Sequence, residues 1–387
     1  MPPYPPSPTD TPRLAQLRGG AVQQKYSARK ITALTANPGC SRRTVLDAAG
    51  IDKELLARRL GHPAPFGQSP FAITRGIAFE EQLKANGYAQ LFALLRSELT
   101  APVEHAAVQD LNLVAGQAGL GLRASETRHV LRRIAEERDT RLILDHPVLS
   151  LDVAGTTAYL EPDALTQRIG GQIFLVEIKS FSAIDGQADP GKVAEAAKQA
   201  AVYVLALRRL LEEIGADPKL AADRFLLVMP KDFSNRPYGR LVDLRQQLDA
   251  VQYQLSRLAR AEELAEMLPA GATLDLSLNP VTEEANATDG QLRSTVETME
   301  ALYGPRCLDM CELARHCRDE ALRQESPARL GSVVRDSVPG LDSVRTALRL
   351  ANGAIPPSTD QEEIADLLRT AQRLRALRLE SPRAAAS

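Results

Sequence analysis

The N-terminal third of the chain carries apolar residues at three- and four-residue spacing, which is the pattern of amphipathic helices. Ser27 is a residue type that caps helices, and we expect a helix from there to Ala36. A loop rich in glycine and proline at 61–70 interrupts the pattern. We therefore expect further helices over 44–60, 79–95, 105–118 and 124–137.

Short strand-like runs replace this pattern after residue 140. Segment 172–179 is the clearest of them, because its apolar and polar residues alternate and Gly170-Gly171 can form the turn before it. We expect further strands over 141–144, 149–154, 157–162, 225–229 and 273–278, and helices over 192–214, 240–267 and from about 289. Strands that alternate with long helices predict an α/β fold with a mixed central β-sheet flanked by helices.

Proline density sets the start of the chain apart from the rest. Six prolines fall within the first 12 residues, a density that disfavours both helices and sheet pairing, so we expect residues 1–28 to form a disordered tail. Residues 29–334 then form the main domain. We expect residues 335–387 to form a helical C-terminal extension that is broken at Pro356-Pro357.

Composition excludes several classes of protein. Apolar residues make up 44% of the chain and charged residues 25%, which is typical of a globular protein. A formal net charge of −2 argues against a protein that coats nucleic acid by bulk electrostatics, although a local binding groove stays compatible with it. The sequence has neither an apolar run of eighteen residues nor a basic leader followed by an apolar stretch, so we expect a cytoplasmic location.

Candidate chemistry lies in two short segments, Pro162-Asp163 and Glu177-Ile178-Lys179. Glu177 and Lys179 are two residues apart on a predicted strand and therefore point to the same face. A hairpin would bring Asp163 beside Glu177, where two carboxylates and the carbonyl oxygen of Ile178 could bind a hard cation such as Mg²⁺. Lys179 could then orient a water molecule or stabilise phosphate charge. The alternative is an ordinary exposed ion pair.

These residues, followed by Gln199-Ala-Ala-Val-Tyr203, resemble the PD-(D/E)xK nucleases of the RecB-type branch. The resemblance implies a restriction-endonuclease-like core. It also implies that Gln199 and Tyr203, four apart on one helical face, line the active site and touch DNA. The alternative for Tyr203 is a place in the hydrophobic core.

The same family carries an acidic residue on an upstream helix. Segment Arg75–Glu80 fits that place, so the resemblance implies that Glu80 is a third metal ligand. Phe79 stands where many members have a metal-ligating histidine, which leaves no histidine ligand at that position. The alternative for Glu80 is a surface residue of the helix.

Three of the four cysteines lie within eleven residues, in a spacing that favours a soft metal over disulfides. Three clustered cysteines after the core and one before it resemble the iron–sulfur RecB-type nucleases, both the AddB-like and the CRISPR-adaptation-like exonucleases. That resemblance implies a [4Fe–4S] cluster, which needs four thiolates. Zinc and buried thiols without a metal are the alternatives. The cysteines are Cys40, Cys307, Cys311 and Cys317.

The histidines receive little weight, because none of the five has the spacing of a metal ligand. The resemblance to these nucleases implies a Mg²⁺- or Mn²⁺-dependent deoxyribonuclease, an exonuclease acting on single strands or DNA ends in DNA repair or antiviral defence. Its partners would be DNA and a helicase or another repair or defence subunit. The alternatives are a double-strand endonuclease and an inactive nuclease-fold subunit that binds DNA or assists assembly.

Overall fold

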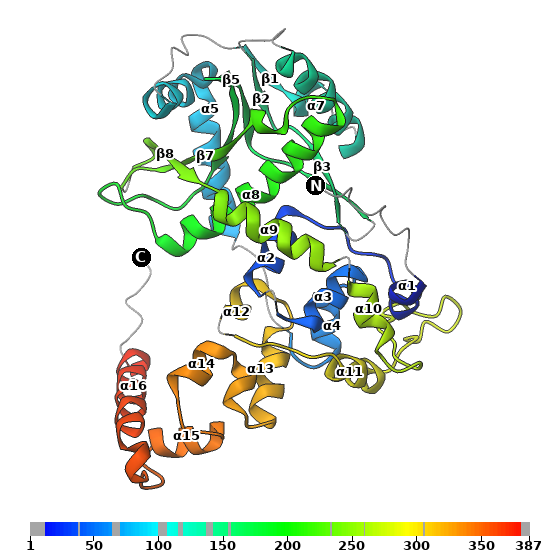
Figure 1. Ribbon diagram of the computed structural model, residues 1–387, viewed down its shortest axis with the longest axis vertical. Coiled ribbons are helices and arrows are strands. Elements are labelled where there is room, and N and C mark those ends of the chain that lie inside the picture. The colour runs from blue at the N-terminus through cyan, green and yellow to red at the C-terminus, as the bar shows by residue number, and fades with distance from the viewer. Residues whose placement is uncertain are drawn as a thin grey trace.

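The computed structural model describes residues 12–37, 39–63, 70–99, 107–114, 119–136, 142–153, 156–232, 234–258, 260–304 and 306–380. A six-stranded mixed sheet organises the upper part of the molecule in Figure 1. Its strands are, in spatial order, β1 (Ala107–Asp110), β2 (Leu142–Asp145), β5 (Ala164–Ile169), β6 (Gln172–Ile178), β7 (Ala221–Pro230) and β8 (Pro237–Asp243). The chain is thus α/β with a mixed sheet, as the sequence predicts.

Strand β6 is central in this sheet, and its interior residues are buried on both faces. It pairs antiparallel with β5 across the turn at Gly170-Gly171, whose positive φ angles suit glycine. On its other side it pairs parallel with β7, and the connection between them is the long helix α8 (Pro190–Glu213). A small second sheet pairs β3 (Leu149–Val153) with β4 (Thr156–Leu160).

Helices cover both faces of the main sheet. Helix α8 packs on one face, with α2 (Ala28–Ala36), α7 (Leu120–Ala135) and α9 (Arg245–Leu258) contributing to the same hydrophobic core. Helix α5 (Pro70–Leu99) covers the other face. Four residues inside α5, 85–88, have non-helical backbone angles, so this helix is two helices joined at a kink.

A helical module below the sheet unites the two ends of the main domain. Its core combines N-terminal residues such as Leu17 and Leu46 with C-terminal ones such as Leu313. The module is visible below the sheet in Figure 1. Its helices are α1 (Pro12–Arg18), α3 (Ser41–Ala48), α4 (Lys53–Arg59), α10 (Ala261–Glu266), α11 (Asp289–Thr298), α12 (Cys307–Met310) and α13 (Ala314–Arg323).

The C-terminal extension is helical, as predicted, and has a small hydrophobic core of its own. Helix α15 ends before Pro356-Pro357, which confirms the predicted break. Residues 381–387 lie outside the described residues. The extension comprises the last residues of α14 (Ser332–Ser337), together with α15 (Val344–Ala351) and α16 (Glu362–Glu380). The remaining elements are α6 (Leu111–Val114) and the 3₁₀ turns Pro218–Leu220, Pro327–Leu330 and Thr359–Gln361.

Several predicted elements are wrong in detail. The predicted helix 44–60 is two helices separated by Gly50, whose positive φ ends the first one. Residues 105–118 contain strand β1 before the short helix α6, and residues 240–267 begin with the end of β8. No strand forms over 273–278, although a single bridge joins Leu278 to Ala285. Strand β5 was not predicted.

The prediction of disorder over 1–28 is wrong for residues 12–28, while residues 1–11 lie outside the described part. Helix α1 is anchored because Leu14 and Leu17 are buried and Arg13 donates hydrogen bonds to carbonyl oxygens after α10, among them that of Pro269 at 2.6 Å. The density of prolines therefore predicts the start of ordered structure too late, because helix α1 already begins at Pro12. Among the described residues, no helix has the length and apolar character needed to cross a membrane.

Replacing Leu17 tests whether this N-terminal helix stabilises the fold. Leu17→Ala leaves a cavity in the core of the helical module, and we expect the free energy of unfolding to fall by about 2–5 kcal/mol in urea denaturation. Val22→Ala, at a highly exposed position, is the control and should change stability by less than about 0.5 kcal/mol. Equal, small effects of both substitutions would contradict an anchored α1.

Candidate functional site

The hairpin of β5 and β6 brings the two predicted carboxylates together. Ala164 pairs with Val176, so the next position outward sets Asp163 opposite Glu177, and directly opposed residues share a face of the sheet. Asp163 Oδ2 accepts a hydrogen bond from the amide of Ile178 at 2.6 Å. The carbonyl of a strand residue leaves on the same side as its amide, so the Ile178 oxygen is directed toward Asp163.

Lys179 follows β6 and lies against Glu177. Its Nζ donates to Glu177 Oε1 at 2.5 Å and to Gln199 Oε1 at 2.9 Å. Gln199 Nε2 in turn donates to the hydroxyl of Tyr203 at 2.9 Å. The five residues expected to be catalytic therefore lie together, and helix α8 contributes two of them. Tyr203 also belongs to the hydrophobic core, so the two interpretations of this residue are compatible.

The electrostatics of the pair of carboxylates are unfavourable without a further cation. Desolvation, followed by the charge of Glu177, raises the pKa of Asp163 to about 8. Desolvation also raises the pKa of Glu177, although Lys179 opposes the shift. The Glu177 side chain is only 2% exposed, and its Oε2 has no hydrogen-bond partner among the described residues. A buried carboxylate oxygen without a partner is costly unless a cation binds there.

Lys179 is held in its charged form. Burial lowers the pKa of this amine, but the charges of Glu177 and Asp163 together outweigh burial and raise it. The ammonium group supplies one positive charge to two carboxylates. Oxygen donors from Asp163, Glu177 and the Ile178 carbonyl are the ligand types that Mg²⁺ and Mn²⁺ prefer, so the residues present fit a hard divalent cation.

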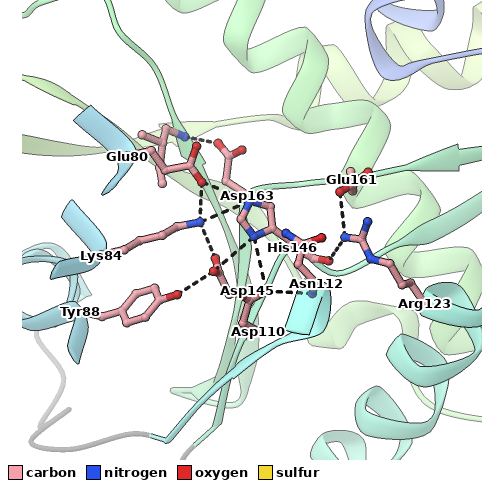
Figure 2. A network of polar contacts seen from close by, with 11 residues as sticks. Glu80, Lys84, Tyr88, Asp110, Asn112, Arg123, Asp145, His146, Glu161 and Asp163 are labelled. Atoms are coloured by element: carbon pink, nitrogen blue, oxygen red, sulfur yellow. Dashed lines mark hydrogen bonds and ion pairs between the residues drawn. The ribbon is translucent and has the colours of Figure 1, made fainter. Parts of the chain in front are cut away.

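Glu80 lies on the kinked helix α5, near Asp163 (Figure 2). It is near enough that its charge raises the pKa of both Asp163 and Glu177. Its carboxylate is ion-paired with Lys84 and lies 3.3 Å from His146 Nε2. Phe79, the residue before Glu80, is buried in the core between α5 and the sheet.

His146 is the site residue that the sequence analysis missed. It follows strand β2, has a positive φ of 49°, and its amide donates to the carbonyl of Asp163 at 3.0 Å. Asp145 and Glu80 raise the pKa of its imidazole to about 10, so it is a cation at neutral pH. No spacing in the sequence signals this role, because sheet pairing brings His146 beside Asp163 and the packing of α5 on the sheet brings Glu80 beside His146.

A network of charged groups continues from His146 (Figure 2). Asp145 accepts a hydrogen bond from Tyr88 at 2.6 Å and lies 2.8 Å from the ammonium of Lys84. Ligand atoms of Asp110, Asp145 and His146 lie within 4.8 Å of one another, which is compatible with a metal ion. The ammonium of Lys84 and the imidazolium of His146 already supply positive charge there. The network therefore fixes the position of Glu80 near Asp163 and Glu177.

The four cysteines gather in the helical module, from both ends of the main domain. Cys40 precedes α3, and the other three lie in or beside α12 and α13. Asn37 donates to Cys307 Sγ at 3.3 Å, and Arg42 donates to Cys317 Sγ at 3.1 Å.

Burial raises the pKa of Cys317 to about 12. The thiols of Cys311 and Cys40 raise this pKa further, so both lie near Cys317. Among the described residues, no three thiols lie within 4.8 Å of one another. Tetrahedral zinc, with bonds of about 2.3 Å, needs its sulfurs about 3.8 Å apart. A four-iron cluster binds each thiolate to a different iron, so its sulfurs stand farther apart. Thiols gathered in one part of the module suit a soft metal, either an iron–sulfur cluster or zinc.

Buried charges surround the thiols. Arg42 binds Glu320 through two hydrogen bonds, of 2.6 and 3.0 Å, and donates to the carbonyl of Met299 at 3.0 Å. Lys53 pairs with both Asp47 and Glu312. Burying such groups is favourable only when each is paired, and the pairs fix the segment after Cys40 against the C-terminal helices.

Comparisons with known proteins add little. No protein-family model matches the chain, and no curated protein does. A crystal structure of SSO0001 matches with a TM-score of 0.24 and 14% identity, over 66% of this chain and 82% of that one. A likeness this loose carries no argument about function.

The raised pKa of Asp163 predicts a pH-dependent stability of the metal-free protein. Between about pH 4 and about pH 8, the folded state keeps a proton that the unfolded chain has lost, so stability falls as pH rises through this window. Asp163→Asn cannot ionise and should remove this fall. We expect the variant to be more stable than the wild type near pH 8, with a difference that shrinks toward pH 4.

Urea denaturation with a chelator, at several pH values across this window, measures the effect. Asp249→Asn, at an exposed position on α9, is the control and should follow the wild-type profile. An Asp163→Asn profile parallel to that of the wild type would show that Asp163 titrates normally.

Proposed function

We propose that the protein is a divalent-metal-dependent nuclease that hydrolyses phosphodiester bonds in DNA. The observation that carries this proposal is the buried carboxylate of Glu177 opposite Asp163: Lys179 binds its Oε1, while its Oε2 has no hydrogen-bond partner among the described residues. An ordinary surface ion pair would not bury a carboxylate to this extent. The pair therefore suits cation binding better than a structural role.

Mg²⁺ or Mn²⁺ would be held by Asp163, Glu177 and the Ile178 carbonyl, with Glu80 as a further ligand. When bound, such a cation polarises the phosphate and lowers the pKa of water. The contacts of Glu80 with His146 and Lys84 fix its carboxylate near these groups. This arrangement gives His146 a positioning role, which acts through Glu80.

The chain's own contribution to hydrolysis centres on Lys179. Its ammonium is oriented by Glu177 and Gln199, and Gln199 is itself fixed by Tyr203. Such pre-organised positive charge can bind a phosphate oxygen and stabilise the charge that develops on it. Gln199 can also contact the DNA backbone, because it lies on the helix face toward the carboxylates.

The resemblance to RecB-type nucleases guides the choice of substrate. We propose that single strands or DNA ends are cut, in DNA repair or antiviral defence, together with a helicase or another subunit of such a pathway. The net charge of −2 suits a nuclease whose metal ions supply local positive charge.

The cysteines form part of the same proposal. A [4Fe–4S] cluster would be held by Cys40, Cys307, Cys311 and Cys317, and would tie the start of the main domain to its end. Because all four thiols are free in the structure, the proposal also assigns the protein to a reducing compartment, the cytoplasm.

A nuclease assay with Lys179→Ala tests the catalytic proposal. We expect Mn²⁺-dependent release of nucleotides from labelled single-stranded DNA, and a loss of about 10²–10⁴-fold in kcat for the variant. Lys219→Ala, which removes an exposed lysine, should keep wild-type activity. Equal activity of the two variants would remove Lys179 from the mechanism. Closed circular DNA should resist degradation if the enzyme needs ends.

The metal content of cysteine variants tests the cluster. Protein purified without oxygen should be brown and contain about four irons per chain, and Cys311→Ser should lose both the colour and the iron. Asp309→Asn, an exposed neighbour between two of the cysteines, should retain them. A colourless wild type with one zinc per chain would replace the cluster with a zinc site.

A further inference from the structure

Helix α16 has two different faces. One face packs against α15 around the buried Ala365 and Leu350 (Figure 1). The opposite face is exposed although it carries leucines: Leu367 is 60% exposed and Leu374 is 63% exposed. Scattered apolar residues are normal on a surface, but these two are seven apart on one helix and therefore lie in line.

The exposed row continues between and beyond the two leucines. Ala371 is exposed between them, and Leu377 is 61% exposed one turn past Leu374. The spacing of 367, 371 and 374 is that of a helix–helix seam, in which small and large apolar residues alternate along one stripe. A seam of this kind is buried when a second helix lies along it.

The two ends of the row carry opposite charges. Glu363 lies one turn before Leu367, and Arg378 lies one turn after Leu374. Both side chains are exposed, and neither forms an ion pair within the part of the chain that the structure describes. The row is therefore acidic at its N-terminal end and basic at its C-terminal end.

We infer that this face of α16 binds the same face of a second copy of the chain, with the two helices antiparallel. An antiparallel register that places Leu367 opposite Leu374 of the second copy also places Glu363 opposite Arg378. A parallel register would instead oppose glutamate to glutamate and arginine to arginine. A single antiparallel register thus pairs the leucines with each other and the opposite charges with each other. The surface is therefore self-complementary.

The contact is small, so the dimer is reversible. Two helices of this length bury on the order of 1,000 Å² or less, at the lower end of specific interfaces. We expect a dissociation constant on the order of 10 µM in sedimentation velocity experiments on the full chain. Leu374→Glu should raise that constant at least about tenfold, because it places a charge in the seam.

Leu278→Glu is the matched control, because Leu278 is 59% exposed but lies outside the C-terminal extension. It should leave the dissociation constant unchanged. A wild type that is monomeric up to about 200 µM, or an association that survives Leu374→Glu, would overturn the inference. So would an equal loss of association in both variants.

A charge exchange tests the antiparallel register without disturbing the leucines. Glu363→Arg alone, or Arg378→Glu alone, places like charges opposite each other in the self-dimer and should weaken association at least about threefold. An equimolar mixture of the two variants restores both ion pairs, so it should associate as tightly as the wild type. A mixture that associates no better than either variant alone would overturn the antiparallel arrangement.

Discussion

A carboxylate inside a β-sheet is stable only where a positive charge faces it, and this constraint governs the centre of the molecule. Glu177 is buried in strand β6 with neighbours on both sides, and Lys179 is the charge that the chain provides. Strand β6, which carries Glu177 and precedes Lys179, also determines which residues lie beside these two. The antiparallel pairing with β5 presents Asp163, and the crossover through α8 returns Gln199 to the ammonium group.

The arrangement leaves negative charge in excess, and the surrounding elements compensate for it only in part. Glu80 approaches from α5 on the opposite face of the sheet from α8, accompanied by Lys84 and His146. The kink in α5 lets Tyr88 reach Asp145, which anchors this group of side chains. Lys84 and His146 thus neutralise Glu80, whereas Oε2 of Glu177 has no hydrogen-bond partner among the described residues.

Much of the site could be predicted from the sequence because its residues lie on one short, regular segment. The two-residue period of β6 and the four-residue period of α8 relate Glu177 to Lys179 and Gln199 to Tyr203 without knowledge of the fold. His146 could not be found this way, since the pairing of β2 with β5 places it beside Asp163, and Glu80 approaches it from helix α5. Strand β5 itself escaped prediction because its residues are buried almost throughout and show no alternation.

The distance along the chain between site residues has a consequence for how the protein assembles. Asp163, Glu177, Lys179, Gln199 and Tyr203 all belong to one stretch of hairpin, strand and helix, so few intervening residues must be ordered to join them. Glu80 and the cysteines close far longer loops, which carry a larger entropic cost, so we expect these contacts to form after the local ones. The two carboxylates and the ammonium group therefore come from a local part of the chain, whereas Glu80 and Cys40 must be supplied by segments far from it in sequence.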